Sequence, residues 1–346
     1  MVPASPRIEI LLPMFDCERV LGEALDSLRA QTVQDWSALL LDDGSTDGTR
    51  DVAAAYAARD PRFRVVPLPH RGIPRTLNAG LTRCHAPLLA RMDADDVCAP
   101  ERLAVQLDAL DALGRDGVVA TRIRSFKSDG SPPGPGMKRY VRWVNGLLTP
   151  EDHRRERYVE SPLAHDSVLL PRRLFEEHGP YRDVDYAEDY DLWLRLLQRG
   201  VPFLKPPPVL LGVRDDGDRI SRNARMYSQD ALRHCKQAHL TGANGPLAGP
   251  RPVVFWGAGR VGKPWLRELP GLGVPVQAVV DLHPRKLGKR IHGIPVIPPE
   301  ALPERWAALE SPLLLAGVGA PGARDDIRQR LAPLALTEQQ DYLFVA

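Results

Sequence analysis

The sequence has few cysteines, and they are scattered. Cys17, Cys84, Cys98 and Cys235 form no Cys-x-x-Cys pair and have no histidines at matching spacings, which argues against a zinc site or a disulfide framework. No signal-peptide-like apolar segment follows the start, and no apolar run approaches the roughly 18 residues of a membrane helix. We therefore expect a cytoplasmic protein in a reducing compartment.

An excess of charge of one sign is also lacking. The formal net charge of +2 over 346 residues gives no indication of a nucleic-acid partner. Basic residues do gather locally, at Lys138–Arg142 and Arg154–Arg157. Such clusters are usually solvated surface, and the alternative is that they face phosphates or an anionic membrane. A content of 43% hydrophobic and 26% charged residues predicts a soluble globular chain, long enough for roughly two domains.

Short apolar runs alternate with helical patterns over the first part of the chain. This alternation predicts an α/β fold with a parallel sheet, in which ligands bind beyond the carboxyl ends of the strands. Residues that directly follow a strand are therefore the first candidates for a site. The expected strands are Ile8–Pro13, Ser37–Leu41, Phe63–Pro67 and Leu88–Met92, and the expected helices are Val20–Gln31, Thr46–Arg59, Ile73–Arg83 and Pro100–Leu113.

The pattern changes further along the chain. From Ser125 to Arg157, glycine, proline and charge interrupt it, and we expect an irregular loop or flap there. Helices are expected from about Glu188 and over Met226–Leu240. Residues 241–251 have the composition of a linker. We therefore expect one domain at residues 1–240 and a second at residues 252–346.

Two carboxylates, Asp42 and Asp43, follow the second expected strand. One interpretation is a turn in which an Asp, Ser or Thr side chain caps the next helix. A calcium loop is a poor match, because the twelfth position is Ala54 where a bidentate Glu is required. The functional interpretation is that Asp43 accepts a hydrogen bond from a ring N–H of a pyrimidine base.

Three carboxylates, Asp93, Asp95 and Asp96, follow the fourth expected strand. Carboxylates this close repel one another unless donors or a cation compensate them. An Asp-x-Asp motif at the edge of a parallel sheet suits a clamp of Mg²⁺ or Mn²⁺ on a diphosphate. The alternative is a solvated acidic turn.

Together these motifs resemble the family-2 glycosyltransferases of GT-A fold, over roughly residues 7–225. A later matching stretch, Tyr186–Leu196, contains the adjacent carboxylates Glu188 and Asp189. The resemblance implies a nucleotide-sugar-binding domain built on a parallel-type sheet. The other matching stretches are Ile10–Pro13, Ser27–Leu28 with Gln31–Thr32, Leu41–Thr49, Gly72–Ile73 with Asn78–Leu81, and Asp93–Asp96.

The resemblance also implies roles for individual residues. Asp189 matches the family's general base, with Glu188 as the fallback, although a carboxylate stabilised by a helix N-terminus is the plain alternative. Asp93 and Asp95 would contact the ribose and the metal-bound diphosphate, with Asp95 as the metal ligand. The nucleotide pocket would also include Pro13, Asp16, Asp43 and Arg75. The sequence departs from the family pattern at Met14–Asp16 and at His70–Arg71, which leaves the base and the sugar less defined.

Other polar residues allow two interpretations each. His165 and Asp166 could line the acceptor side, or His165 could be an ordinary hydrogen-bonded histidine. Arg75, Arg219 and Arg222 could contact the diphosphate, or they could be solvated.

A Gly-x-Gly-x-x-Gly motif follows the expected linker. Its glycines, Gly257, Gly259 and Gly262, come after an expected strand, and a second strand ends at Asp281. This context predicts a small Rossmann-like α/β domain whose glycines approach a nucleotide and whose Asp281 accepts a ribose hydroxyl. The segment is similar to nucleotide-binding domains attached to bacterial polysaccharide-biosynthesis enzymes. A packing or oligomerisation module without a ligand is the alternative.

The sequence therefore favours an inverting, metal-dependent glycosyltransferase. The donor would be a nucleotide-diphosphate sugar, with UDP as the expected nucleotide, and the acceptor a glycan or lipid-linked hydroxyl in surface polysaccharide biosynthesis. We expect Mg²⁺ or Mn²⁺ as cofactor, with NAD or a nucleotide sugar as the candidate second ligand. Peripheral contact with the inner face of the membrane and homo-oligomerisation stay open. So do two other functions: a catalytically silent nucleotide-sugar-binding protein, and an NAD-dependent enzyme acting through the C-terminal domain.

Overall fold

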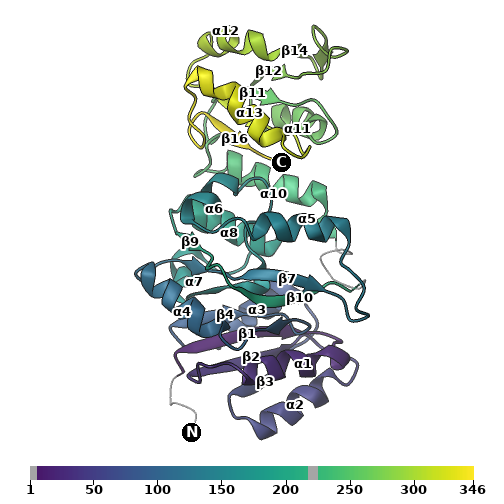
Figure 1. Ribbon diagram of the computed structural model, residues 1–346, viewed down its shortest axis with the longest axis vertical. Coiled ribbons are helices and arrows are strands. Elements are labelled where there is room, and N and C mark those ends of the chain that lie inside the picture. The colour runs from purple at the N-terminus through teal and green to yellow at the C-terminus, as the bar shows by residue number, and fades with distance from the viewer. Residues whose placement is uncertain (1–5, 217–224) are drawn as a thin grey trace. The chain divides into compact units, whose positions relative to one another are not determined.

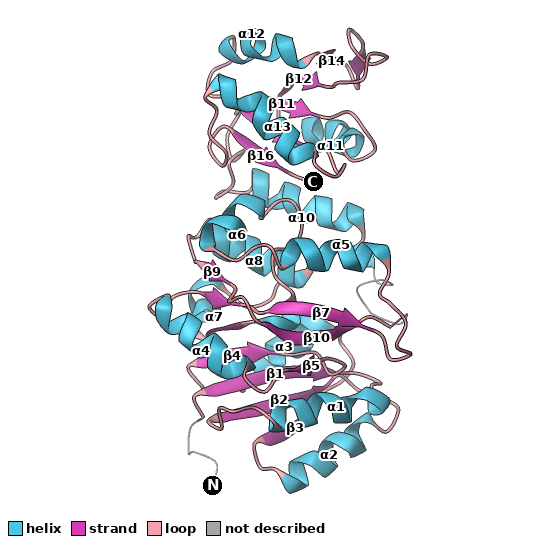
Figure 2. Ribbon diagram, viewed as in Figure 1, coloured by secondary structure: helices cyan, strands magenta, loops and turns pink. Residues whose placement is uncertain are grey.

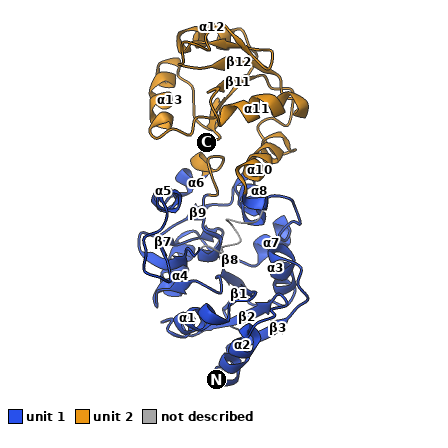
Figure 3. Cartoon of the chain, turned by 90° about the vertical axis from the view of Figure 1, so that its right-hand side faces the viewer, with its two compact units in different colours: residues 1–153, 162–227 blue, residues 154–161, 228–346 orange. Residues whose placement is uncertain are grey.

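The chain folds into two compact units, shown in blue and orange in Figure 3. The computed structural model describes residues 6–216 and 225–346. One unit comprises residues 1–153 and 162–227, and the other comprises residues 154–161 and 228–346. This division falls ahead of the helix α10 (Gln229–Thr241), whereas the sequence analysis places the linker after it.

A seven-stranded sheet forms the centre of the first unit (Figure 1). Its order is β3-β2-β1-β4-β8-β6-β9, and the first four of these strands run parallel to one another. Strand β8 is antiparallel to both β4 and β6. The strands are β1 (Ile8–Met14), β2 (Trp36–Asp42), β3 (Phe63–Pro67), β4 (Leu88–Arg91), β6 (Val118–Val119), β8 (Leu169–Pro171) and β9 (Phe203–Leu204).

Helices cover both faces of this sheet, because its strands are apolar on both sides. Ile10 and Leu12 of β1 pack in one hydrophobic cluster with residues of α1 and α4. Leu11 packs in the opposite cluster with residues of α3, α7 and α8. Burial on both faces is the rule for parallel strands. The helices are α1 (Glu18–Arg29), α2 (Thr49–Arg59), α3 (Ile73–Leu81), α4 (Arg102–Ala112), α7 (Arg173–His178) and α8 (Glu188–Gln198).

A second, three-stranded sheet has the order β5-β10-β7 (Figure 2). Its strands are β5 (Val97–Cys98), β7 (Arg122–Phe126) and β10 (Val209–Arg214). Strand β5 directly follows Asp93–Asp96, which fixes that acidic turn against β10.

The expectation of an irregular loop from Ser125 to Arg157 is wrong. This stretch contains α5 (Pro135–Val144) and α6 (Pro150–Glu156). Proline stands at the first position of each helix, where its missing N–H costs no hydrogen bond. Val144 is buried in the core, and Tyr140, Val141 and Trp143 pack against it. Prolines that looked like chain breakers therefore mark helix starts.

A six-stranded sheet forms the second unit, in the order β13-β14-β12-β11-β15-β16. All its neighbouring pairs are parallel except β13 with β14. Its elements after α10 are β11 (Val253–Trp256), α11 (Gly262–Glu268), β12 (Val276–Val280), β13 (Arg290–Ile291), β14 (Ile294–Ile297), α12 (Leu302–Ala307), β15 (Leu313–Ala316), α13 (Ala323–Leu331) and β16 (Tyr342–Phe344). In the described parts of both units, no helix is long and apolar enough to cross a membrane.

Candidate active site

The polar residues predicted from the strand ends meet at one edge of the first sheet. Strand β1 lies between β2 and β4, with Met14 opposite Asp42 and Leu11 opposite Arg91. The Asp43 N–H donates to the Met14 carbonyl at 2.9 Å, which holds the turn after β2 against the end of β1. The turns that follow β1, β2 and β4 therefore share the edge at which parallel sheets bind ligands.

Asp43 is bound to the start of α3. Its carboxylate accepts hydrogen bonds from the backbone N–H groups of Arg71 at 2.9 Å and Gly72 at 3.0 Å, and from the Thr76 hydroxyl at 2.7 Å. His70 Nδ1 lies 3.0 Å from Asp43 Oδ2. Asp43 is only 5% exposed. Asp43 thus satisfies donors at the N-terminus of α3, whereas Asp47 of the same turn accepts from the Thr49 N–H at 3.0 Å, at the start of α2.

An aromatic pair lies beside Asp43. The rings of Phe15 and His70 stack with centroids 4.4 Å apart, and Phe15 is 40% exposed. Asp16, in a left-handed conformation with φ of 46°, accepts a hydrogen bond from the Thr46 N–H at 2.7 Å. Pro13 is half-buried in β1. Phe15 and His70, two of the residues that depart from the family pattern, therefore form an exposed stacked pair, whereas Met14 is buried.

The acidic turn, Asp93–Asp96, is held by Arg214 of β10. The Arg214 N–H donates to Asp96 Oδ1 at 2.9 Å, and its Nε donates to the Asp95 carbonyl at 2.8 Å. Asp96 is fully buried, whereas Asp93 and Asp95 are half-buried. The side chains of Asp93 and Asp95 are therefore partly accessible. The buried Asp96 side chain instead holds the turn to β10 from inside the protein.

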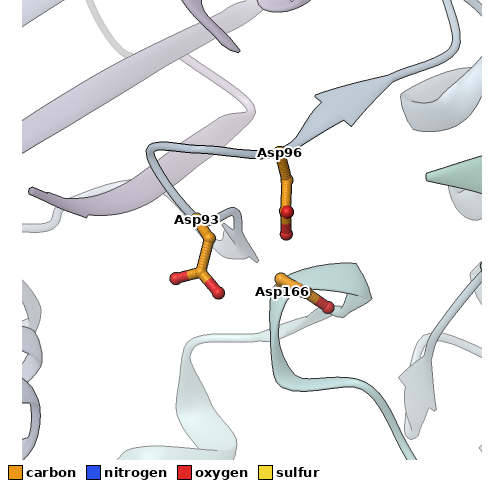
Figure 4. A group of neighbouring side chains, drawn as sticks. All are labelled: Asp93, Asp96 and Asp166. Carbon is orange, nitrogen blue, oxygen red and sulfur yellow. The ribbon is translucent and has the colours of Figure 1, made fainter. Parts of the chain in front are cut away.

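One group of carboxylates could hold a cation, and Asp95 is not part of it. Asp93, Asp96 and Asp166 each offer an oxygen within 4.8 Å of the others (Figure 4). Asp96 Oδ2 and Asp166 Oδ1 are buried and have no hydrogen-bond partner among the described residues. Carboxylate oxygens are the ligands that Mg²⁺ and Mn²⁺ prefer, and unpaired buried ones are costly. The residues present at the acidic turn thus fit a hard divalent cation.

Arg91 is the positive charge of this site. It is buried at the end of β4, with Nη1 2.5 Å from Asp93 Oδ1 but without hydrogen-bond geometry. Burial lowers the pKa of its guanidinium, but the charges of Asp93 and Asp166, and of Glu188 beyond them, raise it above the ordinary value. Arg91 therefore stays charged and links the acidic turn electrostatically to the first turn of α8.

The predicted catalytic pair lies in that first turn. Glu188 is buried, whereas Asp189 is half-buried and accepts a hydrogen bond from the Tyr190 N–H at 2.8 Å. Burial, together with the neighbouring charge of Glu188, raises the pKa of Asp189 to about 8. A carboxylate of this kind can take a proton near neutral pH.

His165 lies behind the pair and is hydrogen-bonded. Its Nε2 lies 2.9 Å from the Tyr181 hydroxyl, and its Nδ1 lies 3.7 Å from Glu188 Oε1. Burial and the charge of Arg91 lower the pKa of this imidazole well below its usual value, so that it is neutral. The neutral histidine is therefore hydrogen-bonded to Tyr181 and lies near the Glu188 carboxylate without an ion pair.

Three arginines were candidates for a contact with the diphosphate. Arg75 is exposed and pairs with Asp183, with nitrogen–oxygen distances of 2.9 and 2.6 Å. Arg219 and Arg222 lie outside the described residues.

The sequence analysis missed Arg91, Arg214 and Tyr227, which contact or neutralise the acidic side chains of the site. A charged residue inside the apolar run Leu88–Met92 was an available signal for Arg91. Nothing in the local sequence distinguishes the other two.

The second unit brings its predicted residues together as well. The Asp281 carboxylate accepts hydrogen bonds from the N–H groups of Ala258 and His283, both at 2.8 Å, and from Lys286 Nζ at 2.9 Å. A Cβ on Gly262 would lie 1.8 Å from the Gly257 carbonyl oxygen, whereas one on Gly259 would meet nothing within 4 Å. Gly262 is thus required for packing, and Gly259 faces open space.

Two solved structures are similar in fold to this chain. The structure titled S. aureus TarS 1-349 in complex with UDP-GlcNAc matches 70% of this chain and 68% of its own, with a TM-score of 0.55 and 16% identity. The mannosyltransferase PcManGT from Pyrobaculum calidifontis, in complex with GDP-Man and Mn²⁺, matches 70% of this chain and 73% of its own, with a TM-score of 0.52 and 20% identity. These likenesses confirm the predicted GT-A fold.

Sequence comparison gives the family. The model of glycosyl transferase family 2 matches residues 9–179. The amylovoran biosynthesis glycosyltransferase AmsE of Erwinia amylovora is 30% identical over 217 residues, which cover 62% of this chain and 78% of AmsE. The chain belongs to glycosyl transferase family 2.

Proposed function

We propose that this protein is an inverting, metal-dependent glycosyltransferase that transfers a sugar from a nucleotide-diphosphate sugar to a hydroxyl group. The observation that carries the proposal is that the charge of Arg91, which pairs with Asp93, also acts on the half-buried Asp189. Its raised pKa suits a general base, and the charge of Arg91 connects it with Asp93 and Asp166. A base on one side and a diphosphate-binding turn on the other are the two requirements of a direct displacement.

In this mechanism Asp189 accepts the proton of the acceptor hydroxyl. The acceptor oxygen forms a bond to the anomeric carbon as the bond from that carbon to the nucleoside diphosphate breaks, which inverts its configuration. A divalent cation would neutralise the charge that develops on the leaving diphosphate. Asp95 is the ligand implied by the family resemblance, and Asp93, Asp96 and Asp166 are the carboxylates close enough to hold the ion together. Arg91 holds Asp93 in place from inside the protein. Glu188, which is buried, supports Asp189 and does not itself reach the acceptor.

The names of similar proteins support the proposed substrates. AmsE is named for amylovoran biosynthesis, and TarS and PcManGT are titled with UDP-GlcNAc and GDP-Man. We accordingly propose a nucleotide-sugar donor, with UDP as the first nucleotide to test, and a glycan or lipid-linked acceptor in surface polysaccharide biosynthesis. The binding of Mn²⁺ by PcManGT supports a metal cofactor here.

We also propose a cytoplasmic location with contact to the inner face of the membrane. The exposed residues Lys138, Arg139 and Arg142 of α5 would face anionic headgroups there. Sedimentation with anionic vesicles that does not change when these three charges are removed would contradict this contact.

The central test is turnover of nucleotide sugars with Mn²⁺, after a thermal-shift panel has selected the donor that raises the melting temperature most. Asp189→Asn is expected to lower kcat by ~10²–10⁴ while donor binding is retained, because only the proton acceptor is lost. The matched control is Asp108→Asn, an exposed aspartate in α4. Wild-type kcat in Asp189→Asn would exclude this mechanism, and binding without turnover for any acceptor would favour the silent binding protein.

No observation favours the NAD-dependent alternative over this proposal. The Asp281 carboxylate, which would bind a ribose, already accepts three hydrogen bonds within its own unit. Nucleotide binding by the second unit stays a prediction.

A further inference from the structure

Buried polar groups lie around the Glu188 side chain, next to the proposed base. The Tyr227 hydroxyl donates to Glu188 Oε2 at 3.0 Å, and Oε1 of the same carboxylate lies 3.7 Å from His165 Nδ1. The imidazole in turn contacts the Tyr181 hydroxyl at 2.9 Å. Glu188 is 1% exposed, so this carboxylate is held inside the protein, with the Tyr227 hydroxyl as a hydrogen-bond donor.

The Glu188 carboxylate acts on Asp189 through its charge. Glu188 and Asp189 are consecutive in α8, and the negative charge of Glu188 is, after burial, the largest influence that holds a proton on Asp189. Within residues 6–216 and 225–346, the charge of Arg91 opposes this influence. The charged or titratable groups that face this pair are Arg91 of β4, Asp93 of the acidic turn, His165 and Asp166 before β8, Tyr181 and Tyr227.

We propose that Tyr227 is a positioning residue, whose hydroxyl keeps the Glu188 carboxylate ionised and fixed behind Asp189 and thereby makes Asp189 an effective proton acceptor. The proposal rests on the glycosyltransferase function proposed above. No substrate needs to touch Tyr227. Its position next to the proposed catalytic turn could not be read from its place in the sequence, 38 residues after Asp189.

The direction of the effect follows from the hydrogen bond. Burial raises the pKa of Glu188, and the Tyr227 hydroxyl opposes that rise because it donates to the ionised form. Without the hydroxyl, Glu188 takes up a proton more readily and its negative charge is lost. Asp189 then releases its proton at a lower pH and is a weaker base. The acidic limb of the kcat profile should move to lower pH, and the plateau should fall.

The experiment compares the full-length wild type with Tyr227→Phe, Glu188→Gln and the double variant, measuring kcat and KM with donor and Mn²⁺ from about pH 5.5 to 9.5. Tyr227→Phe is expected to move the acidic limb down by roughly half to one pH unit and to lower the plateau about three- to tenfold, with little change in donor KM. Glu188→Gln should shift the limb at least as far. The double variant should match Glu188→Gln, because both changes act through the same carboxylate.

Tyr56→Phe is the matched control, since its hydroxyl donates to the Gly22 carbonyl at 3.1 Å, away from the site. An unchanged pH profile in folded Tyr227→Phe, or shifts that add in the double variant, would overturn the inference alone. If Tyr227→Phe does not fold, an unshifted Glu188→Gln profile has the same consequence. A wild type that turns over no nucleotide sugar overturns the proposed function itself.

Discussion

Asp43 offers the most direct test of what a motif residue does in this fold. The sequence motif assigns it to a nucleotide base, whereas the structure shows its carboxylate bound to Arg71, Gly72 and Thr76 at the start of α3. Replacement by asparagine keeps the shape of the side chain but leaves one acceptor oxygen for three donors and removes the charge. The perturbation therefore separates the two roles.

The expected magnitude follows from those contacts. A hydrogen bond to a charged group contributes about 1.5–3 kcal/mol, and loss of a helix cap costs about 1 kcal/mol. Asn can still accept from some of the donors, so Asp43→Asn should lower the free energy of unfolding of the first unit by about 1–3 kcal/mol. Asp108→Asn, in an exposed position, should change it by less than about 0.5 kcal/mol.

Urea unfolding gives the free energy, and amide exchange over residues 70–81 locates the loss. Faster exchange at the start of α3 is expected in Asp43→Asn, because the N–H groups of Arg71 and Gly72 lose acceptors. Unfolding and exchange like those of the wild type, combined with loss of UDP binding, would refute the capping role and restore the base-reading one.

Two further comparisons test the metal and the second unit. Asp95→Asn is expected to reduce Mn²⁺-dependent turnover on the order of 100-fold, as measured by titration of Mn²⁺. Wild-type turnover in Asp95→Asn, together with reduced turnover in Asp96→Asn and Asp166→Asn, would assign the cation to the buried group instead. Gly262→Ala should destabilise the second unit by about 1–3 kcal/mol, because its Cβ would lie 1.8 Å from a carbonyl oxygen, whereas Gly259→Ala has open space and should melt like the wild type. If the glycine motif Gly257–Gly262 binds a nucleotide, Gly259→Ala should abolish the thermal shift caused by NAD or a nucleotide sugar. Equal melting temperatures for Gly262→Ala and Gly259→Ala would contradict the packing role of Gly262.

Local patterns gave the first unit's main sheet with good accuracy. The four expected parallel strands correspond to β1 to β4, and the expected helices between them correspond to α1 to α4, with ends displaced by a few residues. These elements are predictable because each carries its own apolar periodicity. The stretch from Ser125 to Arg157 was missed, since the helix α5 begins with Gly134-Pro135, a pair that resembles a chain break when its packing is unknown.

The candidate site divides in the same way. Asp93 and Asp189 were predicted from neighbours in the sequence, and the charge of Arg91 acts on both. Arg214 was not identified, because it acts on Asp95 and Asp96 from almost 120 positions away. The boundary between the units likewise depends on which unit contains α10, and nothing in the neighbouring sequence indicates this.

The sequence by itself determined which kinds of side chain stand at the strand ends, because strand, turn and carboxylate are adjacent in the chain. Only the tertiary structure decided how each carboxylate is used. Asp43 stabilises a helix 28 to 33 residues away, and Asp189 owes its high proton affinity to burial beside Glu188. Hydrogen-bond saturation and desolvation depend on what packs around a group, and distant segments of the chain supply those neighbours.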